Sequence, residues 1–302
     1  MTTISFDGRV AIVTGAGGGL GRAYALELAR RGAAVVVNDI GGTVDGTGSS
    51  TRAADAVVDE IRAAGGDAVA DYGSVADPEQ AAQTVRTAIE SIGAVGAGVY
   101  NGGLLRDRSV GNMALEEGNA VLDVHLRGAF HIALPAYGHM KEQGYGRFVF
   151  VSSNAGLLGN FGQANYGAAK MGLVGLSNVL AIEGAKYGIK SNVIAPVAAT
   201  RMTEDLLGPF AERLAPELVA PMVAYLASDG CDVTHEVFSA GGGRFARFFV
   251  GVTRGWFSPE RVEAEDIAAH LSEIRETDGF RILGSATEEL QLLGSTLEGG
   301  TP

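Results

Sequence analysis

The chain of 302 residues carries 23 Lys and Arg against 35 Asp and Glu, a formal net charge of −12, and 46 % of its residues are hydrophobic. This composition excludes wholesale disorder, the length suits one large domain or two small ones, and the acidic balance argues against nucleic acid or an anionic membrane as a partner. A single cysteine, Cys231, excludes an internal disulfide; we expect no metal site, no membrane span and a cytoplasmic location.

Short apolar runs and stretches of helical spacing alternate through the first 200 residues or so. The apolar runs predict strands near residues 10–13, 33–37, 67–71, 97–100, 147–152 and 191–195. Helical spacing predicts helices near residues 20–31, 52–64, 115–142 and 163–187, and Asp77-Pro78 predicts the start of another. Continuous apolar strands alternating with helices predict an α/β fold, a Rossmann-type doubly wound parallel sheet with helices on both faces.

A glycine-rich loop, Thr14 to Gly21, follows the first predicted strand and opens the first predicted helix. Glycines let the backbone approach a pyrophosphate, and a helix N-terminus offers free N–H groups and the positive end of the helix dipole. We therefore predict that Gly15, Gly19, Leu20 and Gly21 bind a dinucleotide cofactor. A glycine-rich turn without a ligand is the alternative.

Acidic residues follow or end the next two strands. Asp39 comes 20 residues after Gly19, where a carboxylate accepts hydrogen bonds from the adenosine ribose and repels a 2′-phosphate. The next basic residue is Arg52, so this pattern favours NAD over NADP. Asp71 and the adjacent Tyr72 are predicted to contact the adenine, with a turn or helix-cap role for Asp71 as the alternative.

Tyr166 and Lys170 lie four residues apart and therefore on one face of the predicted helix 163–187. A phenol with an ordinary pKa of ~10 is a weak base at neutral pH, and a cation one turn away favours its phenolate. Ser153, just past a predicted strand, can hydrogen-bond the same reacting oxygen. Taken alone, Tyr166 and Lys170 also fit a surface pair.

These motifs together resemble the short-chain dehydrogenase/reductase family over about residues 8–240. More narrowly, the chain resembles the (3R)-hydroxyacyl-CoA dehydrogenase part of peroxisomal multifunctional enzyme type 2 and its bacterial relatives. The passages that carry this likeness are Val37 to Gly42, Leu105 to Ser109, Val124 to Gly128, Gly159 to Tyr166, and Thr200 to Thr203. We expect this chain to lack the hydratase and sterol-carrier parts of the multifunctional enzyme.

The resemblance implies roles for the catalytic residues. Tyr166 is the general base that takes the hydroxyl proton as hydride passes to NAD, Lys170 lowers the pKa of Tyr166 and binds the nicotinamide ribose, and Ser153 orients the substrate oxygen. Residues 196–214 resemble the family's substrate lid, with Thr200 near the cofactor carboxamide; an ordinary connection is the alternative for this segment.

The sequence departs from the family pattern at two places. Many members carry an Asn that holds a water of the proton relay where this chain has His125, for which a core histidine bonded to the backbone is the alternative. The usual Asn-Asn-Ala-Gly reads Tyr100-Asn101-Gly102-Gly103 here. Asn101 is still expected to brace the sheet beside the cofactor.

From about residue 241 the alternation stops. We predict a dinucleotide-binding catalytic domain over residues 1–240 and a C-terminal extension, 241–302, packed on the same domain. The extension carries five aromatic residues that suit either plain packing or an acyl pocket: Phe245, Phe248, Phe249, Trp256 and Phe257. Three interleaved arginines suit either a solvated face or the phosphates of coenzyme A: Arg244, Arg247 and Arg254.

The leading hypothesis from the resemblance is NAD-dependent oxidation of a (3R)-3-hydroxyacyl-CoA in fatty-acid or sterol side-chain β-oxidation. The alternatives are a dehydrogenase of free hydroxysteroids or other secondary alcohols, and a cofactor-bound scaffold without turnover. The expected partners are an acyl-CoA substrate and further copies of the chain in a homodimer or homotetramer.

Overall fold

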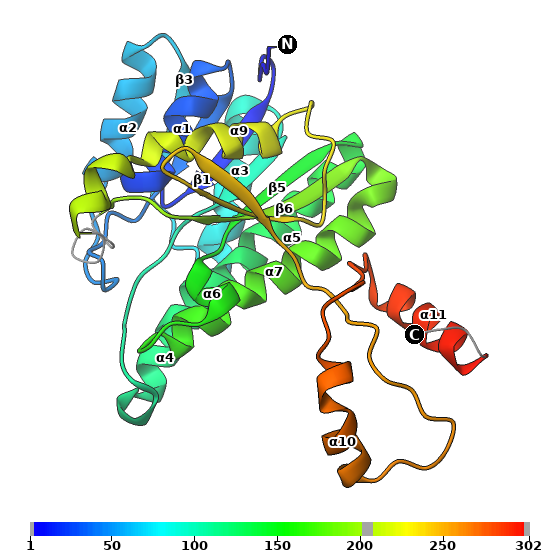
Figure 1. Ribbon diagram of the computed structural model, residues 1–302. Helices are drawn as coiled ribbons and strands as arrows, with labels where there is room; N and C mark the ends of the chain where they lie inside the picture. The colour runs from blue at the N-terminus through cyan, green and yellow to red at the C-terminus, as the bar shows by residue number, and fades with distance from the viewer. Residues whose placement is uncertain (1–2, 201–207, 299–302) are drawn as a thin grey trace. The chain divides into compact units, whose positions relative to one another are not determined.

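The computed structural model describes residues 3–200 and 208–298, and within these ranges the chain forms one eight-stranded sheet (Figure 1). The strand order is β3-β2-β1-β4-β5-β6-β7-β8. The strands are β1 (Val10–Thr14), β2 (Ala34–Asn38), β3 (Asp67–Asp71), β4 (Ala97–Tyr100), β5 (Gly146–Val151), β6 (Ile189–Pro196), β7 (Val237–Gly241) and β8 (Arg244–Phe248). All neighbours from β3 to β7 pair in parallel, which confirms the predicted fold class.

Helices cover both faces of the sheet. In chain order, the described α-helices are α1 (Gly19–Arg30), α2 (Arg52–Ala63), α3 (Pro78–Ile92), α4 (Leu115–Leu122), α5 (Gly128–Gln143), α6 (Asn154–Leu158), α7 (Ala164–Gly184), α9 (Ala220–Ala227), α10 (Ala264–Ile274) and α11 (Ala286–Leu297). Helix α1 contacts α2 and α9, whereas α3 contacts α5, and α7 contacts α4 and α6. The main core lies where α1, α2 and α9 meet the sheet, with Tyr24 and Leu28 of α1 fully buried.

Local sequence signals explain most element boundaries. Every residue of β1 and β5 is buried, as the continuous apolar runs predicted. Helix α3 begins at Pro78 because the Asp77 carboxylate accepts hydrogen bonds from the N–H groups of Glu79 and Gln80, each at 2.9 Å. It ends at Gly93, whose φ of 99° is left-handed and strained for residues with a side chain.

Two features of the fold were not predicted. The long helix expected over residues 115–142 is interrupted by a π-helical segment, Asp123–Arg127, which joins α4 to α5 and contains His125. Such a segment is rare and occupies a single turn, which is too short for hydrophobic periodicity to reveal. The sequence analysis also placed no strand after residue 195, although β7 extends the parallel sheet beside β6.

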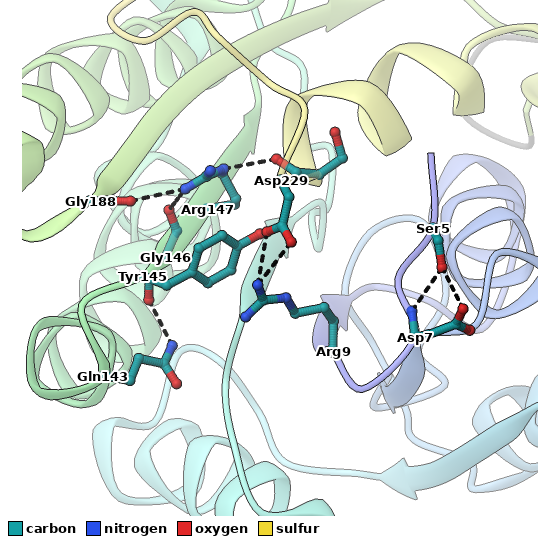
Figure 2. Close-up of polar contacts among 10 residues, drawn as sticks. Ser5, Asp7, Arg9, Gln143, Tyr145, Gly146, Arg147, Gly188 and Asp229 are labelled. Carbon is teal, nitrogen blue, oxygen red and sulfur yellow. Dashed lines mark hydrogen bonds and ion pairs between the residues drawn. The ribbon is translucent and has the colours of Figure 1, made fainter. Parts of the chain in front are cut away.

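A group of polar contacts around Tyr145 lies at the amino ends of β1 and β5 (Figure 2). The predicted site lies at the opposite, carboxyl ends of the strands. The Tyr145 ring lies between two guanidinium groups, with Arg9 at 3.9 Å and Arg147 at 4.3 Å from its centroid. Arg9 also donates to both carboxylate oxygens of Asp229, at 2.8 and 3.0 Å. The buried Arg147 donates to backbone carbonyls, among them that of Ser228. These contacts fasten the starts of β1 and β5 to the segment after α9.

The chain divides into two compact units, Met1–Arg247 and Phe248–Pro302. The predicted boundary between residues 240 and 241 falls inside β7, and the packing of the extension on the main domain stays a prediction. Within the second unit, Phe249 stacks on Phe280 with centroids 5.2 Å apart, and Trp256 stacks on His270 at 4.0 Å. Plain packing therefore accounts for two of the five aromatic rings.

Candidate active site

The glycine-rich loop lies between the end of β1 and the start of α1. Gly15 and Gly19 have φ values of 62° and 52°, in the left-handed region that favours glycine. A Cβ at Gly15 would lie 2.6 Å from the Gly102 Cα, and one at Gly21 would lie 2.1 Å from the Gly15 carbonyl oxygen. The loop therefore packs directly on the segment after β4, and Gly21 allows the first turn of α1 to fold against it.

A cavity of about 490 Å³ opens above this loop, at the carboxyl ends of β1, β2 and β4. From β1 the chain builds the sheet outward through β2 to β3 and then crosses over to β4 on the other side of β1, and α/β sheets bind ligands at such a switch point. Gly15, Gly19, Leu20 and Thr200 line the cavity, whereas Gly21 is buried beneath it. The volume and the exposed backbone suit a dinucleotide.

Asp39 lines the same cavity. Its two carboxylate oxygens accept hydrogen bonds from the Gly17 N–H at 2.8 Å and the Gly41 N–H at 2.6 Å. A Cβ at Gly17 would lie 2.9 Å from this carboxylate, so the loop approaches Asp39 as closely as glycine permits. The carboxylate thus shapes the glycine loop and presents its remaining lone pairs to the cavity.

Asp71 and Tyr72, for which adenine contact stays a prediction, form hydrogen bonds to other parts of the chain. The Asp71 carboxylate accepts hydrogen bonds from the Asn38 amide (2.6 Å) and the Thr84 hydroxyl (2.8 Å), and Tyr72 is 45 % exposed and donates to Asp55. Neither residue is among the described residues that line the cavity. The turn role, given as the alternative for Asp71, fits these contacts better than adenine binding does.

Asn101 braces the end of β4 against β1. Its side-chain amide donates to the Gly15 carbonyl (3.1 Å), and its N–H donates to the Thr14 hydroxyl (3.0 Å). The preceding Tyr100 is buried and stacks on Phe150 at 4.7 Å, so it fills the core rather than the cavity. The brace expected from Asn101 is therefore present despite the altered motif.

Ser153, Tyr166 and Lys170 come together where β5 ends and α7 begins. Ser153 caps α6, with its hydroxyl accepting from the Ala155 N–H, and its hydrogen bond to the Tyr166 phenol works to lower the pKa of that phenol. Burial outweighs this effect and raises the pKa of Tyr166 above its ordinary value. The two hydroxyls can hold one substrate oxygen between them.

Lys170 is 3 % exposed and donates from Nζ to the Val151 carbonyl at 2.6 Å. Its Nζ lies 5.5 Å from the centroid of the Tyr166 ring, and burial lowers the pKa of Lys170 to about 7. Burial is the largest influence on the Tyr166 pKa and raises it, so the lowering of that pKa expected from Lys170 stays a prediction.

His125 combines features of both interpretations given for it. It is 4 % exposed, and its Nε2 lies 3.0 Å from the Leu104 nitrogen and 2.8 Å from the Leu104 oxygen, as in a core histidine bonded to the backbone. Its ring also meets Tyr166 edge-on with centroids 5.1 Å apart. A Cβ at Gly103 would lie 2.1 Å from His125 Cε1, so the glycine at this position makes room for the histidine.

The His125 imidazole is neutral, because burial first and the Lys170 charge second hold its pKa well below 6.5. An unfolded chain takes up a proton on this side chain near pH 6.5 and the folded chain does not, so folding stability falls as the pH drops below that value. We expect the melting temperature of His125→Asn to fall less between pH 7 and pH 5 than that of the wild type.

The same variants test the relay role of His125. An Asn suits this position in related enzymes, so His125→Asn should keep much of the turnover. His125→Leu should lower kcat more than it weakens NAD binding. If both variants fold and turn over like the wild type in a steady-state assay, His125 is a core histidine only.

Several residues that line the cavity were missed. They come from the loop after Asp39 and from the segment after Asn101, and include Thr43, Val44, Gly46, Leu104 and Arg106. The Leu105 N–H donates to the Val44 carbonyl at 3.0 Å, which joins the two segments across the cavity. Two features of the sequence could have indicated that these segments line the cavity: their glycines and their position directly after the ends of strands. Of the predicted lid, 196–214, residues 201–207 lie outside the described residues.

Other kinds of site find no support in the described ranges. Among residues 3–200 and 208–298, no three His, Cys, Asp or Glu side chains are arranged to hold a metal ion. No helix in the described part of the chain is both long and apolar enough to cross a bilayer.

Of the three arginines noted near residue 250, Arg247 pairs with Glu236 at 3.1 Å.

The family model for short chain dehydrogenases matches residues 9–207. The chain belongs to this family. It is therefore an oxidoreductase that acts on hydroxyl groups, and its Rossmann-like sheet agrees with that of its structural relatives. The family as a whole uses a nicotinamide dinucleotide, and the glycine loop with its cavity fits such a cofactor.

Relatives of the chain carry narrower names. A Mycobacterium tuberculosis protein named as a short-chain type dehydrogenase/reductase is 52 % identical over 91 % of this chain and 97 % of its own length. Peroxisomal multifunctional enzyme type 2 of Drosophila melanogaster is 56 % identical over 76 % of this chain, which spans only 38 % of that protein. The hydroxyacyl-CoA dehydrogenase ChsB1 of M. tuberculosis is 41 % identical over 78 % of each chain.

A solved structure extends this likeness to the fold. The full-length Drosophila multifunctional enzyme matches 98 % of this chain and 50 % of its own chain, with a TM-score of 0.82 and 40 % sequence identity. The chain thus resembles one part of a longer multifunctional protein.

Proposed function

We propose that the protein oxidises a (3R)-3-hydroxyacyl-CoA to the 3-oxoacyl-CoA with NAD as the acceptor, in the degradation of a fatty acid or a sterol side chain. The proposal rests on the hydrogen bond between the Ser153 and Tyr166 hydroxyls, in a chain whose glycine loop and Asp39 line a cavity of dinucleotide size. The names of two relatives, a multifunctional enzyme type 2 and a hydroxyacyl-CoA dehydrogenase, support the substrate class.

The chain's own residues have distinct tasks in this reaction. Ser153 donates a hydrogen bond to the substrate hydroxyl oxygen and orients it, and the Tyr166 phenolate takes the hydroxyl proton. The nicotinamide, when bound, accepts the hydride. Lys170, whose Nζ donates to the Val151 carbonyl, lies one helical turn from Tyr166 and would bind the nicotinamide ribose. Because burial raises the pKa of Tyr166, oxidation should speed up as the pH rises.

One spectrophotometric assay of NADH formation tests the proposal. It compares R- and S-3-hydroxyacyl-CoA thioesters of different acyl bulk with free hydroxysteroids, each with NAD and with NADP. The proposal expects the highest kcat/KM with a thioester and NAD. A free hydroxysteroid oxidised more efficiently than every thioester would establish the alternative, a dehydrogenase of free secondary alcohols.

Asp39 should set the cofactor preference. A carboxylate that faces a 2′-phosphate is unfavourable, so NAD should be preferred over NADP by at least ~10-fold in kcat/KM, about 1.4 kcal/mol. Among the described lining residues the only cation is Arg106, whose Nε donates to the Asp45 carbonyl at 3.2 Å. The combined change Asp39→Ser with Ile40→Arg should narrow or invert the preference. Equal use of both cofactors by the wild type would refute the ribose role of Asp39.

We also propose that the chain forms a homodimer or homotetramer. Helices α5 and α7 expose large apolar side chains that suit such an interface: Phe130, Leu134, Met171, Val179 and Ile182. A monomer in multi-angle light scattering at micromolar concentration would refute this proposal.

A further inference from the structure

The segment Leu104–Arg108 connects the cofactor cavity to the turn that precedes Tyr166. On the cavity side, the Leu105 N–H donates to the Val44 carbonyl at 3.0 Å. Leu104 itself lines the cavity and contacts His125 through its backbone. The other end of the segment runs beside residues 160–165, at the start of α7.

Backbone contacts hold this segment against the turn. The Arg108 N–H donates to the Gly162 carbonyl at 2.8 Å. The Asn165 amide donates to the Arg106 carbonyl at 3.0 Å, while the Asn165 side-chain oxygen accepts the Tyr166 N–H at 2.7 Å. The start of α7, which carries Tyr166, is thereby held to the segment by one contact at Arg106 and another at Arg108.

One side-chain pair completes the connection. Gln163 is 8 % exposed, and its Nε2 donates to the Asp107 carboxylate at 2.8 Å. Its Oε1 accepts from the Asn160 amide at 3.0 Å. The amide nitrogen and the amide oxygen of Gln163 therefore both form hydrogen bonds. The bond to Asp107 joins the turn 160–165 to the segment Leu104–Arg108. The Asp107 charge also reaches Tyr166, where it acts to raise the pKa of the phenol.

We propose that Asp107 and Gln163 are positioning residues for the reaction. Their hydrogen bond holds the turn 160–165 against the segment Leu104–Arg108, and this sets the place of the Tyr166 phenol relative to Ser153 and the cofactor cavity. The inference rests on the proposed role of Tyr166 as the base and deepens it. Small misplacements of a catalytic group lower the rate strongly, so the pair should matter for turnover more than for binding.

A polarity swap tests the pair. Gln163→Glu places two carboxylates against each other, so kcat should fall ~10-fold or more with little change in KM or in NAD affinity by calorimetry. Adding Asp107→Asn lets the introduced amide donate to the introduced carboxylate, and kcat should return to within about 3-fold of the wild type. Recovery of kcat in the double variant distinguishes positioning from a general loss of stability.

A matched control makes the same change elsewhere. Gln143, at the end of α5, donates from its amide to the Val95 carbonyl at 2.7 Å. The same amide donates to the Tyr145 carbonyl at 2.7 Å (Figure 2). Gln143→Glu should lower the melting temperature and leave kcat at the wild-type value, since this residue lies at the opposite end of the sheet.

The outcomes separate this inference from the proposed function. Wild-type kcat in Gln163→Glu, or a folded double variant as impaired as Gln163→Glu, overturns the positioning role. If Gln163→Glu does not fold, Asp107→Ala is measured instead, because Asp107 is exposed and its replacement disturbs the core little. An unchanged kcat in Asp107→Ala would also overturn the positioning role. If Tyr166→Phe keeps its turnover, the assigned base is wrong, whatever the pair does.

Discussion

Tyr166→Phe should lower kcat at least ~100-fold, the scale of a general-base contribution, while NAD still binds. The substitution removes the phenolic oxygen and keeps the ring, so its packing against His125 is retained. The wild type should gain activity as the pH rises because burial raises the pKa of Tyr166, and the variant should lack this rise.

The measurements are the pH profile of kcat and a titration with NAD. Ser153→Ala is the companion variant, because it removes the hydroxyl that orients the substrate and lowers the pKa of Tyr166. Near-normal turnover of Tyr166→Phe would end the assigned mechanism.

The second large effect concerns the substrate epimer. The R epimer of a 3-hydroxyacyl-CoA should be oxidised with a kcat/KM at least ~100-fold above that of the S epimer. In the proposed mechanism, Ser153 and Tyr166 would hold the oxygen from one side, and a cofactor in the cavity would lie on a fixed side of the substrate. The opposite epimer turns its reacting hydrogen away from the acceptor.

The coenzyme A part of the substrate adds binding energy of its own. Its removal should lower kcat/KM at least ~10-fold, about 1.4 kcal/mol. The assay uses both epimers of one thioester and the corresponding free hydroxy acid. Equal rates for the two epimers would contradict the proposed stereochemistry, and equal kcat/KM without coenzyme A would contradict the substrate class.

The fold could be predicted because its signals are local. The central strands β1 and β5 are buried along their whole length and read as short apolar runs, and helix starts such as Asp77-Pro78 carry their own capping chemistry. The π-helical segment Asp123–Arg127 was not predicted, since it spans a single turn and such turns are rare within α-helices.

The sequence by itself determined the glycine loop and the pairing of Tyr166 with Lys170, because each depends on spacing along a single element, and its resemblance to a family added Ser153 to them. Only the tertiary structure decided the partners of long-range polar groups. It showed that Asp71 bonds to Asn38 rather than lining the cavity, and that Lys170 is buried against a carbonyl. It also paired Asp107 with Gln163, 56 residues apart. Such pairings depend on which strand ends meet at one edge of the sheet, and no local pattern encodes that meeting.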